Sequence, residues 1–137
     1  MSVARAGSLY HLRPLRAGLP FGATISGIDL EKHTEDTALV TQIAHDLQRH
    51  RLLIVKNQGI LSAETQLKVS RWFGEIDSTF HCHPQSPHPD IFRVSNDPTE
   101  GCLNVGRSGW HIDGTFRAMP FKGTLLPLAL ALSHSGG

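Results

Sequence analysis

The chain has 137 residues, of which 39% are hydrophobic and 18% are charged, and its formal net charge at neutral pH is +1. This composition is typical of one soluble globular domain and excludes a disordered or fibrous chain. Because 13 basic residues balance 12 acidic ones, the sequence offers no electrostatic basis for binding nucleic acid.

Cysteine content and hydrophobicity indicate where the protein works. Cys82 and Cys102 are too few for a disulfide scaffold, and no secretory signal precedes them. The longest apolar run, Leu125–Leu132, contains Pro127 and is far shorter than the roughly 20 residues that a membrane span needs. We therefore expect a cytoplasmic location and no membrane partner.

The N-terminal region predicts short strands followed by a helix. Prolines and glycines interrupt the apolar positions from Leu9 to Leu30, as in paired edge strands. Thr34 or Asp36 can cap a helix, and the apolar residues after them recur at helical spacing on one face: Leu39, Val40, Ile43, Ala44 and Leu47. The polar residues at the end of this helix are expected to face solvent: His45, Asp46, Gln48, Arg49 and His50.

A buried strand and a second helix follow. The apolar run Leu52–Val55 predicts the strand, and Ser62 can open the helix. We expect Leu67 and the pair Trp72–Phe73 on the inner side of this helix, with Gly74 just past its end.

After residue 76 the sequence changes character. Residues 77–90 and 96–109 are rich in proline, histidine, glycine and asparagine and predict two loops, separated by a brief strand at Ile91–Val94. Trp110–Phe116 alternates as a strand does, and Thr124–Leu132 is a further β-leaning run.

His111 and Asp113 are the candidate metal ligands. Residues two apart in a strand point to the same face, so an imidazole and a carboxylate would lie side by side. Such a pair is two-thirds of the facial triad that holds non-haem Fe(II) with open coordination positions. On spacing alone, a surface hydrogen-bonded pair is the alternative and is the commoner explanation of His-x-Asp.

Four segments, in order, resemble a known family. The segment W-H-I-D-G-T-F resembles the metal-binding motif of the taurine/2,4-dichlorophenoxyacetate dioxygenase family, with Ile112 in place of the usual Thr or Ser. The three other segments are similar to the opening, a strand and the F-G-x-L motif of that family: Phe21–Leu30, Leu52–Gln58 and Phe73–Ile76.

The resemblance implies a fold and a reaction. The expected class is α+β, mainly β: a partial double-stranded β-helix (jelly roll) with two flanking helices, and residues 1–137 forming a single incomplete domain. The implied enzyme binds Fe(II) and 2-oxoglutarate, consumes O2, and hydroxylates a small organic substrate while 2-oxoglutarate is decarboxylated to succinate. A homo-oligomer is compatible with this assignment.

Further positions follow from the resemblance. In the taurine enzyme a His before a Pro contacts the anionic group of the substrate; His83 matches it, and His81 is an alternative because the spacing from Gly74 is longer here. Asn104 is a further candidate for lining the substrate pocket. The other histidines are expected at the surface: His11, His33, His45, His50 and His88.

The resemblance also indicates what this chain lacks. The second metal His and the Arg that pairs with 2-oxoglutarate belong to the C-terminal half of the family domain, and a jelly roll needs about eight strands. We therefore expect a fragment that is inactive alone. Two alternatives remain: a catalytically dead chain that binds metal weakly or pairs with another chain through its strand edges, and a zinc site built from His81, Cys82, His83 and His88.

Overall fold

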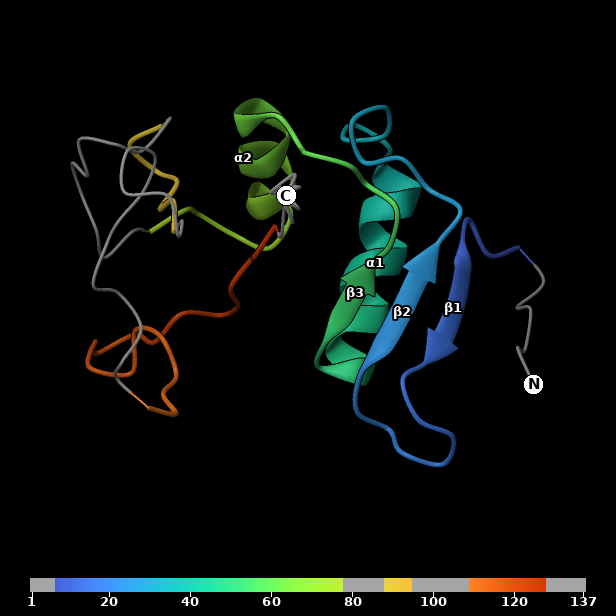
Figure 1. Cartoon of the computed structure of the whole chain (residues 1–137), viewed down its shortest axis with the longest axis horizontal. Helices are drawn as coiled ribbons and strands as arrows, with labels where there is room; N and C mark the ends of the chain where they lie inside the picture. Colours follow the sequence, from blue (N-terminus) through green and yellow to red (C-terminus); the bar gives the residue numbers. More distant parts are fainter. Residues whose placement is uncertain (1–6, 78–87, 95–108, 128–137) are drawn as a thin grey trace, which may run out of the picture. The chain divides into compact units, whose positions relative to one another are not determined.

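The computed structural model describes residues 7–77, 88–94 and 109–127 (Figure 1). The chain divides into two compact units, one formed by residues 1–62 with 127–137 and the other by residues 63–126. None of the helices within the described ranges is long and apolar enough to cross a membrane.

The first unit is built on a three-stranded mixed sheet with the order β1-β2-β3. β1 (His11–Pro14) pairs antiparallel with β2 (Ala23–Ser26), and β2 pairs parallel with β3 (Leu53–Val55) (Figure 1). Parallel neighbours need a crossover connection, and α1 (Thr37–His50) provides it. The predicted strands and helix of this region are therefore confirmed, and the architecture is α+β. Two details differ from the prediction, because β2 is the central strand and not an edge strand, and β3 is half-buried and not buried.

Local capping explains where α1 begins and ends. Oδ1 of Asp36 accepts hydrogen bonds from the backbone N–H groups of Ala38 and Leu39, both at 3.0 Å, which pairs two of the donors that a helix start leaves without partners. Arg51 ends the helix in the left-handed conformation, with φ 66°, and its N–H donates to Leu47 at 2.7 Å. Asp36 is thus the N-cap, and it is one of the two residues predicted for this role.

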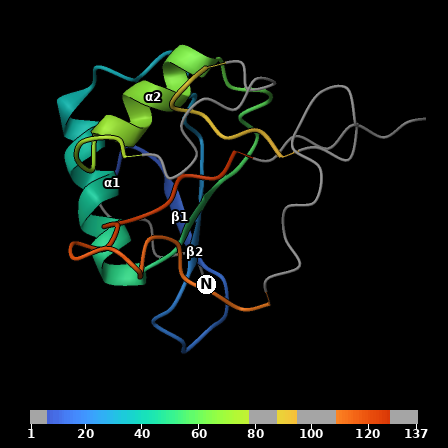
Figure 2. The same cartoon turned by 90° about the vertical axis from the view of Figure 1, so that its left-hand side faces the viewer.

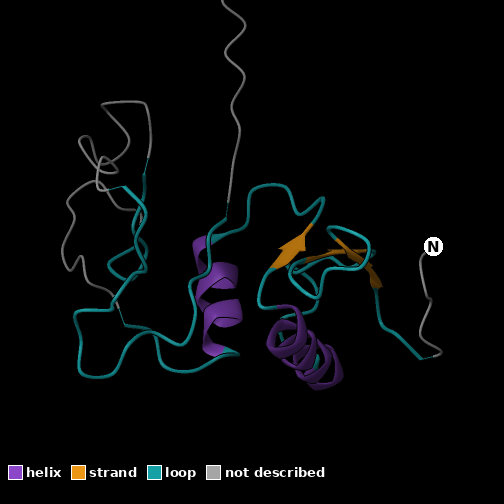
Figure 3. Cartoon of the chain, turned by 90° about the horizontal axis from the view of Figure 1, so that it is seen from below, coloured by secondary structure: helices purple, strands orange, loops and turns teal. Residues whose placement is uncertain are grey.

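The core of this unit lies between the sheet and α1, which runs along one face of the strands (Figure 3). Ala23 and Ile25 of β2 are completely buried, and Leu39 and Ile43 of α1 are nearly so. Burying a side chain of the size of Ile or Leu stabilises a fold by about 1.5–3 kcal/mol. The alternate buried residues of β2 and the apolar residues on one face of α1 therefore pack against each other and hold the sheet and helix together.

Two polar residues of α1 are buried, which corrects the prediction that they face solvent. Asp46 is 4% exposed and accepts a 2.8 Å hydrogen bond from the hydroxyl of Tyr10. His50 is 8% exposed, and its Nδ1 has no hydrogen-bond partner among the described residues. Asp46 comes three residues after Ile43, and His50 comes seven residues after it. This spacing places both on the apolar face of the helix.

Gln58 connects the chain after β2 to the chain after β3. Its side-chain oxygen accepts a hydrogen bond from the N–H of Leu30 at 2.8 Å. Its amide nitrogen donates to the carbonyls of Ile28 at 2.9 Å and Lys56 at 2.7 Å. These bonds join two of the segments on which the family resemblance rests, so the glutamine is a structural clamp.

Replacing Gln58 by alanine should lower the free energy of unfolding by about 1–3 kcal/mol, because backbone groups lose their partner side chain. Urea denaturation of the purified protein measures this change. The matched control is Gln48→Ala on the exposed side of α1, which should stay within about 0.5 kcal/mol of the original protein. Equal stability of the Gln58 and Gln48 variants would contradict the clamp.

The second unit contains α2 (Ala63–Arg71), which directly follows Ser62 as predicted. The helix buries Thr65, Leu67 and Val69. Trp72 and Phe73 come just after its last turn, half-buried, with their rings edge to face and the centroids 6.3 Å apart.

The strands predicted in the second unit are absent from its described part. Where a strand was expected at Ile91–Val94, the only bridge between described residues joins His88 and Ile91. Residues 109–126 contain turns and bends and no strand. The jelly roll therefore stays a prediction.

Candidate metal centre

The segment that carries His111 and Asp113 is a turn-rich loop, visible in orange and red in Figure 2, and not the predicted strand. Gly114 has φ 73°, and its carbonyl accepts a hydrogen bond from the N–H of Arg117 at 3.0 Å, which closes a tight turn. A strand needs a neighbouring strand for its backbone hydrogen bonds, and none of the described residues pairs with this segment. The alternating pattern was therefore misleading here.

The loop nevertheless brings the two predicted ligands together. Nε2 of His111 lies 3.2 Å from Oδ1 of Asp113, and the two side chains are 57% and 52% exposed. On the other side of the ring, Nδ1 of His111 lies 3.0 Å from the carbonyl oxygen of Gly109. The predicted proximity is confirmed, while the role of the pair as metal ligands stays a prediction.

Each nitrogen of the His111 ring lies close to an oxygen atom. Both ring nitrogens face an oxygen that can only accept: the Gly109 carbonyl and the Asp113 carboxylate. A neutral imidazole has one N–H, so it can donate to only one of them. A ring that donates from Nδ1 to the Gly109 carbonyl turns the lone pair of Nε2 toward Asp113, where both side chains could coordinate a metal ion.

The spacing of the pair also fits one metal ion. Two donors on adjacent corners of an octahedral site, each bonded at about 2.1 Å, lie about 3.0 Å apart. The observed separation of 3.2 Å is close to this value. The contact from Nδ1 to a backbone carbonyl is the usual orientation of a metal-binding histidine, because it leaves Nε2 as the coordinating atom.

Side chains next to His111 and Asp113 connect this loop to the chain after α2. Arg117 pairs with the carboxylate of Asp77, and its guanidinium lies over the ring of Phe121 at 5.6 Å from the centroid. The Phe121 ring in turn covers Gly114: a Cβ added there would approach Cδ2 of Phe121 to 2.7 Å. Sequence reasoning missed this connection, since Asp77 lies about 40 positions from Arg117 and no motif links them.

Several large apolar residues of the loop are solvent-exposed. Trp110, Ile112, Phe116 and Met119 each expose most of their side chain.

The predicted substrate residues cannot be placed. His81, His83 and Asn104 lie outside the described residues, as does Cys82 of the alternative zinc site. His88 is half-buried, and its Nδ1 accepts a 3.1 Å hydrogen bond from the N–H of Asp90. Within the described ranges no three His, Cys, Asp or Glu side chains gather around one point, so a third ligand to the His111 pair would come from elsewhere.

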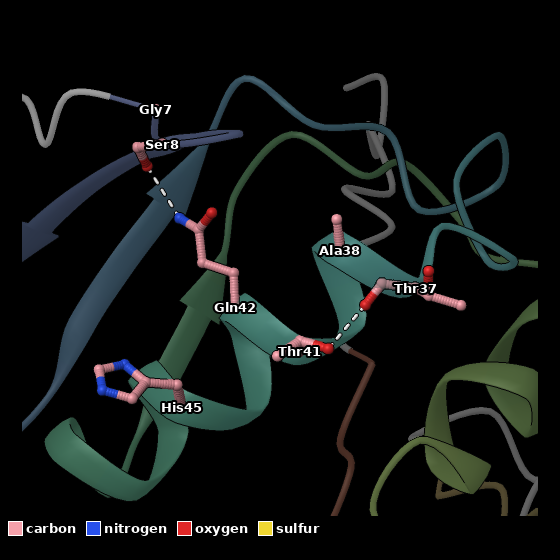
Figure 4. Close-up of a pocket in the computed structure, with 7 residues that line it drawn as sticks. All are labelled: Gly7, Ser8, Thr37, Ala38, Thr41, Gln42 and His45. Carbon is pink, nitrogen blue, oxygen red and sulfur yellow. Dashed lines mark hydrogen bonds between the residues drawn. The ribbon is translucent and has the colours of Figure 1, made fainter.

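The first unit has a surface hollow of about 640 Å³ beside α1 (Figure 4). The Gln42 amide of α1 donates to Oγ of Ser8 across the hollow, and the Thr41 hydroxyl donates to the carbonyl of Thr37 within α1. His45 is the only titratable side chain that lines it. One imidazole in an open hollow does not make a catalytic site.

Comparison with known proteins identifies the family. A sequence profile described as "Taurine catabolism dioxygenase TauD, TfdA family" matches residues 11–137. This chain belongs to the TauD/TfdA family. The match includes the four segments recognised in the sequence, and the role of W-H-I-D-G-T-F as the metal-binding motif stays a prediction.

Two relatives define the extent of the similarity. The chain is 26% identical over 103 residues to the alpha-ketoglutarate-dependent xanthine dioxygenase xan-1 of Neurospora crassa, and the match covers 68% of this chain and 24% of that protein. It also resembles the crystal structure of AAD-2 in complex with Mn(II) and N-oxalylglycine, at 22% identity and a TM-score of 0.43 over 50% of this chain and 25% of AAD-2. The TauD/TfdA chain thus matches about a quarter of each relative.

Proposed function

We propose that the protein is an Fe(II)- and 2-oxoglutarate-dependent dioxygenase that hydroxylates a small organic substrate. The observation that carries the proposal is the His111–Asp113 pair, with 3.2 Å between its donor atoms, in a chain of the TauD/TfdA family. The proposal includes a jelly-roll domain to which residues 1–137 contribute, and a cytoplasmic location.

His111 and Asp113 would hold the iron as two members of a facial triad. When bound, Fe(II) activates O2 for the oxidative decarboxylation of 2-oxoglutarate to succinate and for hydroxylation of the substrate. The Gly109 carbonyl keeps the His111 ring in the tautomer whose Nε2 can coordinate, and the carboxylate of Asp113 supplies the negative charge.

The assignment of substrate-binding residues rests on the family resemblance. We assign His83, with His81 as the alternative, to an anionic group of the substrate, and Asn104 to the pocket wall. Because the curated relative is named as a xanthine dioxygenase, xanthine is the first substrate to test. O2 and 2-oxoglutarate are the other small-molecule partners.

The decisive assay uses the full-length product of the gene that encodes this chain. With Fe(II), ascorbate, 2-oxoglutarate and air, succinate should form, and omission of O2 or addition of a strong iron chelator should reduce it to background. A panel of small substrates that begins with xanthine identifies the one that increases turnover. Succinate release at the same rate with and without the chelator would refute the proposal.

A further inference from the structure

We propose that the ion pair between Asp77 and Arg117, together with the ring of Phe121, positions the His111–Asp113 pair for metal binding. This inference rests on the proposed function. The side chains form a continuous path inside the second unit: carboxylate, guanidinium, aromatic ring, and the glycine that follows Asp113.

The path matters because the described part of this loop has no strand or helix to fix its shape. Its backbone is held by the turn from Gly114 to Arg117 and by the hydroxyl of Thr115, which donates to the carbonyl of Ile112 at 3.1 Å. Both of these bonds join residues of the loop itself. Asp77 is the residue that anchors it to the chain just after α2.

Arginine suits this role better than lysine. A guanidinium is planar and can stack on an aromatic ring while its edge donates to a carboxylate. An ammonium group could keep the charge pair with Asp77 but would not cover the Phe121 ring as well. The side chain of Arg117 is only 36% exposed, so solvent screens the pair less than it screens a fully exposed one.

The close approach of Phe121 to Gly114 links the Asp77–Arg117 ion pair to the two metal ligands. The ring lies so close that only a glycine fits beneath it, and Gly114 adjoins Asp113. If Arg117 no longer covers the ring, Phe121 can move away and the turn that sets the carboxylate opposite Nε2 of His111 loosens. Arg117 and Asp77 are therefore positioning residues and contact neither metal nor substrate.

Metal affinity of the full-length protein tests the proposal without an activity assay. Co(II) is titrated anaerobically while its visible absorption, which reports ligand geometry, is recorded. Loss of groups that orient metal ligands typically weakens metal binding 10–100-fold. We expect Arg117→Ala and Asp77→Asn each to weaken Co(II) binding about 10-fold and to change the band shape, and Arg117→Lys to fall between them and the original protein.

Two further variants and a stability measurement make the outcome decisive. Lys122→Ala, an exposed cation near the same loop, should bind Co(II) as the original protein does. The exchange variant Asp77→Arg with Arg117→Asp should recover part of the lost affinity, which a general loss of stability would not allow. Melting temperatures without metal, within about 2 °C for Arg117→Lys and Asp77→Asn, exclude unfolding as the cause.

The two hypotheses fail in different ways. If Asp113→Ala abolishes Co(II) binding while Arg117→Ala and Asp77→Asn bind like the original protein, the positioning role is wrong and the metal site stands. If the original protein and Asp113→Ala bind Co(II) equally, the metal site is wrong, and the positioning role with it.

Discussion

Replacing His111 or Asp113 by alanine is expected to abolish Fe(II)-dependent release of succinate and to weaken metal binding at least 100-fold. Each variant removes one ligand of the proposed facial triad and breaks up the pair whose donor atoms lie 3.2 Å apart. Coupled succinate assays and Co(II) titration of the full-length protein measure the two effects.

The fold should survive both substitutions. Both side chains are more than half exposed and belong to a loop outside the sheet and helices, so little packing depends on them. Circular dichroism and the melting temperature should change little, and His33→Ala, at an exposed histidine of the first unit, serves as the matched control. Turnover that persists in either ligand variant would show that other residues hold the metal.

Gly114→Ala should have the second-largest effect, with metal affinity lowered about 10-fold or more. The backbone at this glycine has φ 73°, a conformation that costs an L-residue about 1–2 kcal/mol. A methyl group there would also approach Cδ2 of Phe121 to 2.7 Å, so the ring or the turn must shift. Either movement displaces the neighbouring carboxylate of Asp113.

Gly123→Ala is the matched control, because a Cβ at Gly123 meets nothing within 4 Å and its φ is not in the left-handed region. It should bind Co(II) normally. Normal binding by Gly114→Ala alone would mean that the turn adapts and that the ligands do not depend on it.

Sequence patterns predicted the first unit well because its elements are set by local rules. The capping carboxylate of Asp36 and the apolar spacing after it define α1, and the turns before β2 leave few other pairings. The same spacing, read through Asp46 and His50, would have placed both in the core. They were assigned to solvent because polarity was weighed above position, and no sequence rule reveals that Tyr10 donates to Asp46.

Local sequence patterns predicted the structure of the second unit less well. Alternation at Trp110–Phe116 predicted the proximity of His111 and Asp113 for a reason that proved wrong, since a turn and not a strand brings them together. Gly114 in the motif was a signal for that turn. The pairing of Asp77 with Arg117 depends on the path of the chain between them, which composition and periodicity do not encode.

The two tryptophans of the chain stand in contrasting surroundings, and this gives the protein two natural optical probes. Trp110 is fully exposed and directly precedes His111, whereas Trp72 is half-buried against Phe73 after α2. Indole fluorescence shifts to longer wavelength in water and is quenched by a nearby paramagnetic ion. Emission at the red edge therefore reports events at His111, and emission at the blue edge reports the packing after α2.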